Sequence, residues 1–281
     1  MYRVHPQPSA PAPPSPPFGL RIFMGPYGLR AGWRFLLFGL IVAALATGLS
    51  VATHLLDRSI GRNAATVVGN FLGVITALVA MWILGKVEGH SVWSYGFAAP
   101  NRGRNLVAGL ATGIVSLSAL MGLLTLAGVY KPGPSVLRGA DVLLWGLYWA
   151  LLFAGVSLGE ESLTRGYAMF SLAQGIGFWP AAVLLSLLFG AGHLGNRGEE
   201  WVGIGNAMLV GLVLAYSVKW SGSLWWAIGY HMTWDWGESF FYGVADSGSK
   251  AHHHFLSGDP AGAGWLSGGS VGPEGSVLAI P

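Results

Sequence analysis

The chain alternates long apolar segments with short polar breaks. Seven of these segments are long enough to cross a bilayer, since about 20 apolar residues in a helix span its hydrocarbon core. The breaks carry charged or turn-forming residues, as in Asp57-Arg58 and Lys131-Pro132-Gly133-Pro134. The segments lie at 33–56, 65–85, 105–129, 142–173, 178–195, 202–220 and 223–245. This pattern predicts an all-α, polytopic membrane helix bundle of about seven or eight transmembrane helices.

Both ends of the chain depart from this pattern. Residues 1–31 are rich in proline, which predicts a disordered N-terminal tail. Residues 246–281 are rich in glycine and predict a loop or tail, in which 277–280 resembles the first turn of a further helix. The transmembrane domain is therefore expected at 32–245. No cleavable signal peptide is expected, because the first apolar stretch starts only near Trp33.

The composition supports a membrane protein and excludes several other classes. Of the 281 residues, 53% are hydrophobic and 10% are charged, whereas soluble domains carry about 25% charged residues. Nucleic acid is not an expected partner, because the formal charge of +3 comes from few ionisable groups that lie mostly in short loops. The chain has no cysteine, which excludes disulfides, thiolate metal ligands and a cysteine nucleophile. The expected surroundings are the lipid bilayer.

Lys and Arg are distributed unevenly between the two sets of alternate loops. The set that starts with the N-terminal loop, taken with the adjoining ends of the segments, carries more of them. The positive-inside rule then predicts an N-terminus in the cytoplasm.

Ionisable residues that lie well inside the apolar segments, away from their ends, gather in only three of them. Each carboxylate at bilayer depth costs about 2.5–3.5 kcal/mol on insertion scales, so such residues are usually functional. The residues are Glu160, Glu161 and Arg165 in the segment 142–173, His193 in 178–195, and His231, Asp235 and Glu238 in 223–245. The bland alternatives are a buried ion-pair cluster that fixes helix packing and a hydrogen-bonded packing histidine. The clustering favours a polar reaction site.

The spacing of these residues predicts which of them meet. Glu161 and Arg165 are four residues apart and share a helix face, so they can pair. Glu160 points about 100° away and is free to face a cavity. His231 and Asp235 are also four apart, so the carboxylate can orient the imidazole or reach a substrate or metal itself.

Such a set suits peptide-bond hydrolysis. This reaction needs an activated water, a donor to the developing oxyanion and a proton for the amine. Glu160 can act as the base towards water, and the two histidines can donate to the oxyanion. Alternatively, zinc can be bound by Glu160, His193, His231 and Asp235.

Three ordered motifs resemble those of the CPBP intramembrane proteases, which include the type II CAAX prenyl endopeptidases and bacteriocin-processing proteins. The family patterns are Glu-Glu-x-x-x-Arg, Phe-x-x-x-His and His-x-x-x-Asn/Asp on successive membrane helices. They appear here as Glu160-Glu161 with Arg165, Phe189 with His193, and His231 with Asp235, within a core at 142–240. Each motif alone is weak, but the ordered trio on three apolar segments is specific.

The resemblance implies an intramembrane endopeptidase that acts on membrane-anchored proteins or peptides, in the inner membrane of a bacterial cell. By this resemblance Glu160 activates the water, Glu161 and Arg165 support it, and His193, His231 and Asp235 complete the catalytic site. Asp235 stands where prenyl endopeptidases carry Asn, and an added charge there favours a metal. The sequence does not determine the substrate, the cleavage site, a metal or glutamate mechanism, or the oligomeric state.

Three other functions fit some of the same residues. An ion-coupled transporter would use the buried Glu, His and Asp as a proton relay, but no internal repeat supports it. A catalytically silent relative would bind a partner, as in an immunity role. Haem ligation by His193 and His231 is the third.

Two further patterns are expected to be incidental, and the two histidines are expected at different depths. Gly155-Val156-Ser157-Leu158-Gly159 matches a serine-nucleophile pattern but lies inside an apolar helix. The tract 252–254 is three histidines in a glycine-rich stretch. If their two helices enter from the same side, His193 and His231 differ in depth by about 10 Å, at 1.5 Å per residue.

Overall fold

The computed structural model of the chain describes residues 17–25 and 28–280, with only the backbone for 52–60. The proline-rich stretch 1–16 thus lies outside the described residues. The remainder of the expected N-terminal tail forms a 3₁₀ turn at Phe18–Leu20 and a two-stranded antiparallel pair, β1 (Met24–Gly25) and β2 (Gly28–Leu29). This pair precedes the first long helix.

Helices make up most of the described structure. Two π-helical stretches, Ser162–Ala168 and Gly237–Tyr242, directly follow two of the α-helices. The α-helices are α1 (Ala31–Ile60), α2 (Arg62–Glu88), α3 (Arg102–Leu126), α4 (Ala140–Glu161), α5 (Met169–Ile176), α6 (Phe178–Gly192), α7 (Trp201–Ser221), α8 (Trp225–Trp236) and α9 (Gly264–Ser267).

Six helical stretches among the described residues are long and apolar enough to cross a membrane. They are Ala31–Val51, Arg62–Glu88, Arg102–Leu126, Ala140–Ile176, Phe178–Gly195 and Trp201–Ser221. The predicted all-α polytopic membrane bundle is therefore confirmed. The seventh expected segment forms α8, which has 12 residues, and the 6-residue π-helical stretch after it.

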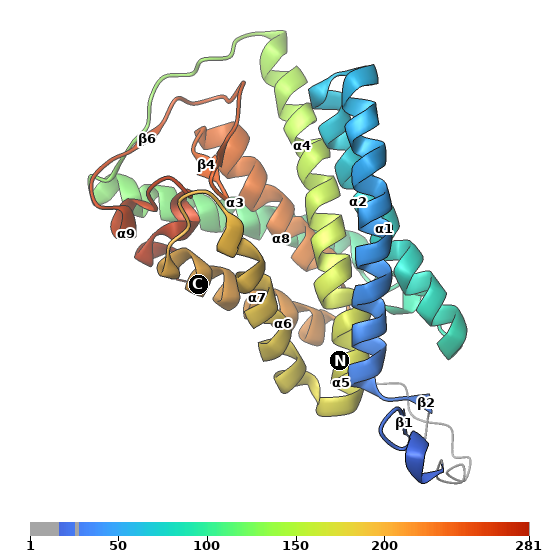
Figure 1. Ribbon diagram of the computed structural model, residues 1–281. Coiled ribbons are helices and arrows are strands. Elements are labelled where there is room, and N and C mark those ends of the chain that lie inside the picture. Colours follow the sequence, from blue (N-terminus) through green and yellow to red (C-terminus); the bar gives the residue numbers. More distant parts are fainter. Residues whose placement is uncertain (1–16, 26–27, 281) are drawn as a thin grey trace.

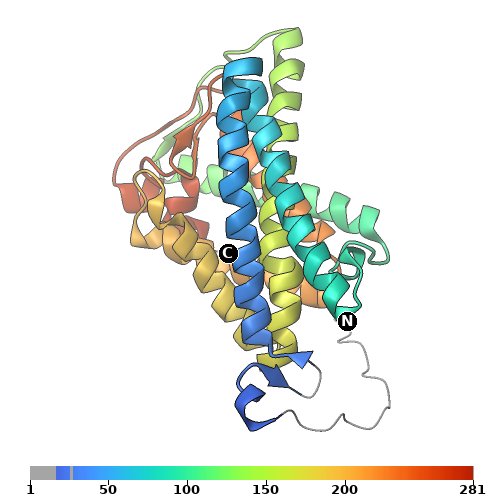
Figure 2. The same ribbon diagram turned by 45° about the vertical axis from the view of Figure 1, so that its right-hand side comes forward.

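The helices form an upright layer and a crossing layer. α1, α2 and α4 stand side by side, while α3 crosses them at a steep angle and packs along α8 (Figures 1 and 2). α6 and α7 pack against each other and are inclined to α4 (Figure 1). Leu40, Leu143 and Leu147 are about two-thirds exposed or more, at 68%, 71% and 70%. An apolar surface of this kind suits contact with lipid.

Glycines permit the closest helix crossing. A Cβ added to Gly109 or Gly113 of α3 would overlap backbone atoms of Trp226 or Tyr230 in α8. The Thr233 hydroxyl of α8 also donates to the Leu110 carbonyl at 2.9 Å. The four-residue glycine spacing therefore marks a real contact, as the small-residue rule predicts. This contact positions α8, which carries His231 and Asp235.

The helical run 140–176 is not a single straight helix. α4 ends at Glu161, and the π-helical stretch that follows contains Gly166 with φ −79° and ψ −121°. Only α5, from Met169, resumes regular geometry. A π-helical stretch adds residues per turn and is frequent at functional sites. Here it begins directly after the glutamate pair.

Residues 246–280 fold back over the ends of α7 and α8 (Figure 1). β3 (Tyr130–Lys131) pairs antiparallel with β6 (Asp259–Pro260), and β4 (Ala245–Asp246) pairs with β5 (Ser249–Lys250). The Asn206 amide of α7 donates to the carbonyls of Glu274 and Ser276, both at 2.8 Å. The segment expected to be a loop or tail is thus irregular but packed against the bundle.

Candidate active site

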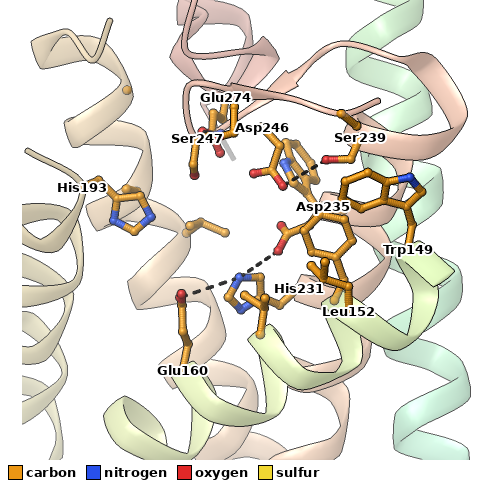
Figure 3. Close-up of a pocket in the computed structure, with 18 of the residues that line it drawn as sticks. Trp149, Leu152, Glu160, His193, His231, Asp235, Ser239, Asp246, Ser247 and Glu274 are labelled. Carbon is orange, nitrogen blue, oxygen red and sulfur yellow. Dashed lines mark hydrogen bonds and ion pairs between the residues drawn. The ribbon is translucent and has the colours of Figure 1, made fainter. Parts of the chain in front are cut away.

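A cavity of about 510 Å³ lies between the helices and the folded-back C-terminal segment. Four of the six predicted site residues line it: Glu160, His193, His231 and Asp235. The side chains of these four residues converge on the open space (Figure 3). Glu161 and Arg165 lie behind the wall, where they are almost completely buried.

The two neighbouring glutamates have opposite surroundings. The Glu160 side chain is 43% exposed, and Glu161 is 0% exposed. Helix geometry causes the difference, because consecutive residues point about 100° apart. Glu160 therefore faces the cavity and can meet water, as the sequence predicted for its direction.

Arg165 neutralises Glu161 inside the protein. Its Nη1 lies 3.0 Å from Glu161 Oε1, and its Nη2 donates to the Gly211 carbonyl of α7 at 3.2 Å. The guanidinium also lies 4.5 Å from the ring centre of Phe189 in α6, a favourable cation–π position. Arg165 thus joins the segments that carry the first two motifs. Phe189 is the aromatic residue of the second motif, so its role in the structure is to hold this arginine.

His231 stands between Glu161 and the cavity carboxylates. Its Nδ1 lies 3.0 Å from Glu161 Oε1, while its Nε2 lies 3.4 Å from Asp235 Oδ2 and 3.9 Å from Glu160 Oε2. An ionised carboxylate only accepts, so Nδ1 carries the proton that it donates to Glu161. Glu161 therefore fixes the orientation of the ring, and Nε2 faces the cavity.

His193 follows the last residue of α6, Gly192, in a 3₁₀ turn. Its Nδ1 lies 2.8 Å from the Phe189 carbonyl oxygen. Since a carbonyl only accepts, this nitrogen also carries the proton and leaves Nε2 towards the cavity. His193 and His231 line the same cavity. The two histidines thus share one site despite the depth difference of about 10 Å expected at 1.5 Å per residue; α6 is inclined to α4 (Figure 1), and α8 has only 12 residues.

The cavity also has acidic residues that the sequence reasoning did not assign to the site. Asp246 and Glu274 line it, and in Figure 3 they lie across it from Glu160. The Ser239 hydroxyl donates to Asp246 at 3.3 Å, and the Ser247 backbone N–H donates to Glu274 at 2.8 Å. Burial, with nearby carboxylates, raises the pKa of Asp246 well above its usual range. Burial also raises the pKa of Glu274.

The predicted zinc ligands are not brought together as a set. Among the described residues, the only group of three or more possible ligand side chains with their ligand atoms all within 4.8 Å is Glu238, Asp246 and Glu274. His231 approaches both Glu160 and Asp235, but a three-membered group with them does not meet this spacing. Zinc at the four proposed ligands would therefore require their side chains to move closer together than they lie in this arrangement.

Two incidental patterns stay outside the site. Ser157 is completely buried, and its hydroxyl donates to the Phe153 carbonyl at 2.7 Å within α4. It therefore faces neither the cavity nor a histidine. In the histidine tract, His253 stacks on Trp145 with ring centres 3.9 Å apart, and His254 Nδ1 lies 2.7 Å from the Leu256 carbonyl oxygen.

Comparison with known proteins identifies the class of the central domain. Residues 141–237 match the family model described as type II CAAX prenyl endopeptidase Rce1-like. This match agrees with the resemblance drawn from the three motifs. Neither the curated proteins nor the solved structures gave a significant match.

The family assignment supports a CAAX-type intramembrane protease, and hence a hydrolase. A membrane-associated protein or peptide is the substrate class that this family implies. Together with the six candidate spans, the match supports an integral membrane protein.

Proposed function

We propose that the protein is an intramembrane endopeptidase in which Glu160 activates the attacking water. One observation carries the proposal: of two adjacent glutamates, Glu160 alone faces a cavity, and His231 Nε2 lies 3.9 Å from its carboxylate. A general base must stand within reach of a water and remain free of a permanent cationic partner. Glu160 meets both conditions, whereas Glu161 is held by Arg165.

In this mechanism Glu160 alone carries out both proton transfers. Glu160 takes a proton from water while the water oxygen bonds to the carbonyl carbon of the scissile peptide. The carbonyl electron pair moves to oxygen and forms the tetrahedral oxyanion. The C–N bond then breaks, and Glu160 returns the proton to the leaving amine. The carboxylate is regenerated and one water is consumed.

His231 and His193 act on the oxyanion through their Nε2 atoms. Each Nδ1–H is already donated, to Glu161 and to the Phe189 carbonyl respectively. Nε2 can then donate to the oxyanion only when the ring is an imidazolium. Asp235, 3.4 Å from His231 Nε2, favours that charged form through its own charge. Asp235 therefore favours the protonated form of His231 that can donate a hydrogen bond to the oxyanion.

Glu161 and Arg165 are positioning residues in this proposal. Glu161 orients the His231 ring, and Arg165 neutralises the charge of Glu161. Zinc, if bound, would polarise the scissile carbonyl and lower the pKa of a bound water. No step of the mechanism passes through it, since its four proposed ligands are not gathered.

The expected substrate is a membrane-anchored protein or peptide. The cavity wall combines the polar site with apolar side chains such as Trp149, Leu152 and Val210. An extended peptide entering from the bilayer would contact both surfaces. The charge distribution along the chain supports a cytoplasmic N-terminus, and the family resemblance supports the inner membrane of a bacterial cell.

The decisive experiment compares wild type, Glu160→Gln and the control Glu200→Gln on a library of membrane-anchored peptides. Glu200 is an exposed glutamate outside the cavity. We expect Glu160→Gln to lower kcat by about 10²–10⁴-fold, as for loss of a general base, while Glu200→Gln cleaves normally. Mass spectrometry gives the cleavage sites. Equal cleavage by wild type and Glu160→Gln would exclude Glu160 as the base.

Two chelators then test separately whether cleavage depends on zinc or on calcium. Phenanthroline prefers zinc and EGTA prefers calcium, so loss of activity with phenanthroline alone would support zinc at the four proposed ligands. Absence of cleavage by a folded, monodisperse wild type would favour the transporter or silent-partner function. Ion-coupled uptake into vesicles would then discriminate between these two.

A further inference from the structure

Asp246 and Glu274 lie at the side of the cavity across from Glu160 (Figure 3). The buried carboxylate of Glu238 lies close to both of them. Glu238 belongs to the π-helical stretch after α8, Asp246 to β4, and Glu274 to the 3₁₀ turn Pro273–Gly275. One oxygen from each lies within 4.8 Å of the others. The group therefore joins three separate segments, of which the last comes from the folded-back C-terminal region.

No cationic side chain forms an ion pair with this group in the described part of the chain. Lys250, close in sequence, pairs with Asp259 at 3.3 Å. Glu238 is completely buried, and neither of its carboxylate oxygens has a hydrogen-bond partner. The Trp234 indole lies near this carboxylate, but its N–H does not form a hydrogen bond with it. Buried carboxylates without compensation are strongly unfavourable, so this cluster requires protons or a bound cation to balance its charge.

We propose that Glu238, Asp246 and Glu274 bind a calcium ion that is separate from the catalytic residues. The donors are all carboxylate oxygens, which favour hard divalent cations over zinc or copper. Ca²⁺–oxygen distances are about 2.3–2.6 Å, so opposed ligands stand at most about 5 Å apart. The observed spacing within 4.8 Å suits such an ion. Mg²⁺ demands shorter distances of about 2.1 Å and usually binds through one or two carboxylates.

The burial of Glu238 favours a small ion over a substrate side chain as the partner of all three carboxylates. Asp246 and Glu274 line the cavity, but Glu238 has no exposed surface and does not line it. A lysine or arginine of a peptide could reach the first two and not the third. A small ion can enter from the cavity and contact all three.

The ion would hold the wall of the active site together. Glu238 continues the helical run that carries His231 and Asp235, while Glu274 belongs to the segment fastened to α7 by Asn206. Binding would thus couple the position of α8 to the C-terminal segment. The coupling does not depend on the chemistry proposed for Glu160.

The test measures binding directly on the purified full chain in detergent. After EDTA treatment and its removal, radioactive Ca²⁺ is titrated by equilibrium dialysis into wild type, Asp246→Asn, Glu274→Gln and Glu160→Gln. We expect one Ca²⁺ per chain for wild type and for Glu160→Gln. We expect at least 10-fold weaker binding for Asp246→Asn and Glu274→Gln, because each loses a charged ligand.

Thermal unfolding gives a second readout that does not require activity. Ca²⁺ should raise the midpoint of wild type and leave Glu274→Gln unchanged. In EDTA, Glu274→Gln should be at least as stable as wild type, because one like charge is gone from the cluster. Two ligand variants are used so that a folding failure in one leaves the other to decide.

Several results would overturn the proposal. These are no Ca²⁺ binding by folded wild type, unchanged binding by both ligand variants, or tighter binding of Mg²⁺ than of Ca²⁺. A site lost in Glu160→Gln but kept in Asp246→Asn would place the ion at the catalytic residues instead.

Discussion

Two groups of carboxylates lie on opposite sides of the cavity, each with one completely buried member, and they differ in what balances their charge. On one side, Glu161 is paired with Arg165 at 3.0 Å and with His231 Nδ1 at 3.0 Å. On the other side, Glu238 and its two neighbours have no ion-pair partner among the described side chains. The paired group carries its cation in the sequence, four residues along one helix. The unpaired group depends on protons or an added ion.

Because of this difference, the two groups should respond differently to changes in pH and in added ions. The paired group resists changes in pH, because arginine remains protonated throughout the accessible range. The unpaired group is sensitive to solution conditions, since its anions repel each other in a low-dielectric site. A site of this kind suits an ion that can be added or removed.

Removing the cation from the paired group should have the largest effect on stability. Arg165→Met leaves Glu161 buried without its main partner, which costs about 3–5 kcal/mol. At roughly 2–4 °C per kcal/mol, the unfolding midpoint should fall by about 10 °C. Thermal unfolding in detergent measures this. The double variant Glu161→Gln/Arg165→Met should recover much of the loss, because no unpaired charge remains. A double variant as unstable as the single one would contradict a charge-based explanation.

In the absence of calcium, the unpaired group should make the stability of the protein depend on pH. The pKa values of Asp246 and Glu274 are raised from ordinary values of 3.8 and 4.5. The folded state therefore holds protons that the unfolded chain has released. The free energy of unfolding must then fall as pH rises from about 4, and it stops falling once the folded carboxyls have ionised. The total loss is about 1.4 kcal/mol for each unit by which the folded pKa exceeds the unfolded pKa. The charged groups facing these two carboxyls are Glu238, Asp235, His231, His193 and Glu199.

The measurement is the thermal midpoint between pH 4 and pH 8 in EDTA, for wild type and for the variant Asp246→Asn/Glu274→Gln. The difference between the two profiles isolates these carboxyls from the other titrating groups. Wild type should lose stability relative to the variant as pH rises, and saturating Ca²⁺ should remove that loss. Parallel profiles would contradict the raised pKa values.

Charge and orientation at Glu161 can be separated by two substitutions. Glu161→Gln keeps an oxygen that accepts the His231 Nδ1 hydrogen, whereas Glu161→Leu does not. We expect kcat to fall about 10-fold for Gln and about 100-fold for Leu, as for other groups that orient a catalytic histidine. KM should stay unchanged, because Glu161 does not line the cavity. Steady-state kinetics on the cleaved peptide measures both. Equal losses for Gln and Leu would mean that the hydrogen bond does not matter.

The sequence predicted the paired side of the cavity much better than the other side. Glu160, Glu161 and Arg165 interrupt an apolar run, so they are conspicuous, and their helical spacing fixes which of them meet. The membrane bundle was predictable for the same reason, because long apolar segments leave few alternatives in lipid. His193 and His231 were found as isolated polar residues in apolar helices.

The other side could not be predicted from local pattern. Asp246 and Glu274 lie in a glycine-rich region without hydrophobic periodicity, so nothing in the sequence places them near Glu238. The two π-helical stretches depend on tertiary contacts, such as the Met81 side chain that lies 3.0 Å from a Cβ built on Gly166. That His193 and His231 line one cavity was also not predictable, because helix tilt follows from packing, which apolar length alone does not determine.

The smallest expected effect concerns Ser157, which lies on the same helix as Glu160 but faces neither group. Its hydroxyl donates to the Phe153 carbonyl at 2.7 Å and has no exposed surface. Alanine is a better helix former, and such bonds to the preceding turn add little stability. Ser157→Ala should therefore change the unfolding free energy by less than about 1 kcal/mol and leave kcat unchanged. Assayed beside Glu160→Gln, it tests whether activity follows the cavity or the Gly-x-Ser-x-Gly pattern. A loss of activity as large as that of Glu160→Gln would require α4 to rotate Ser157 into the cavity, and would make the serine the nucleophile.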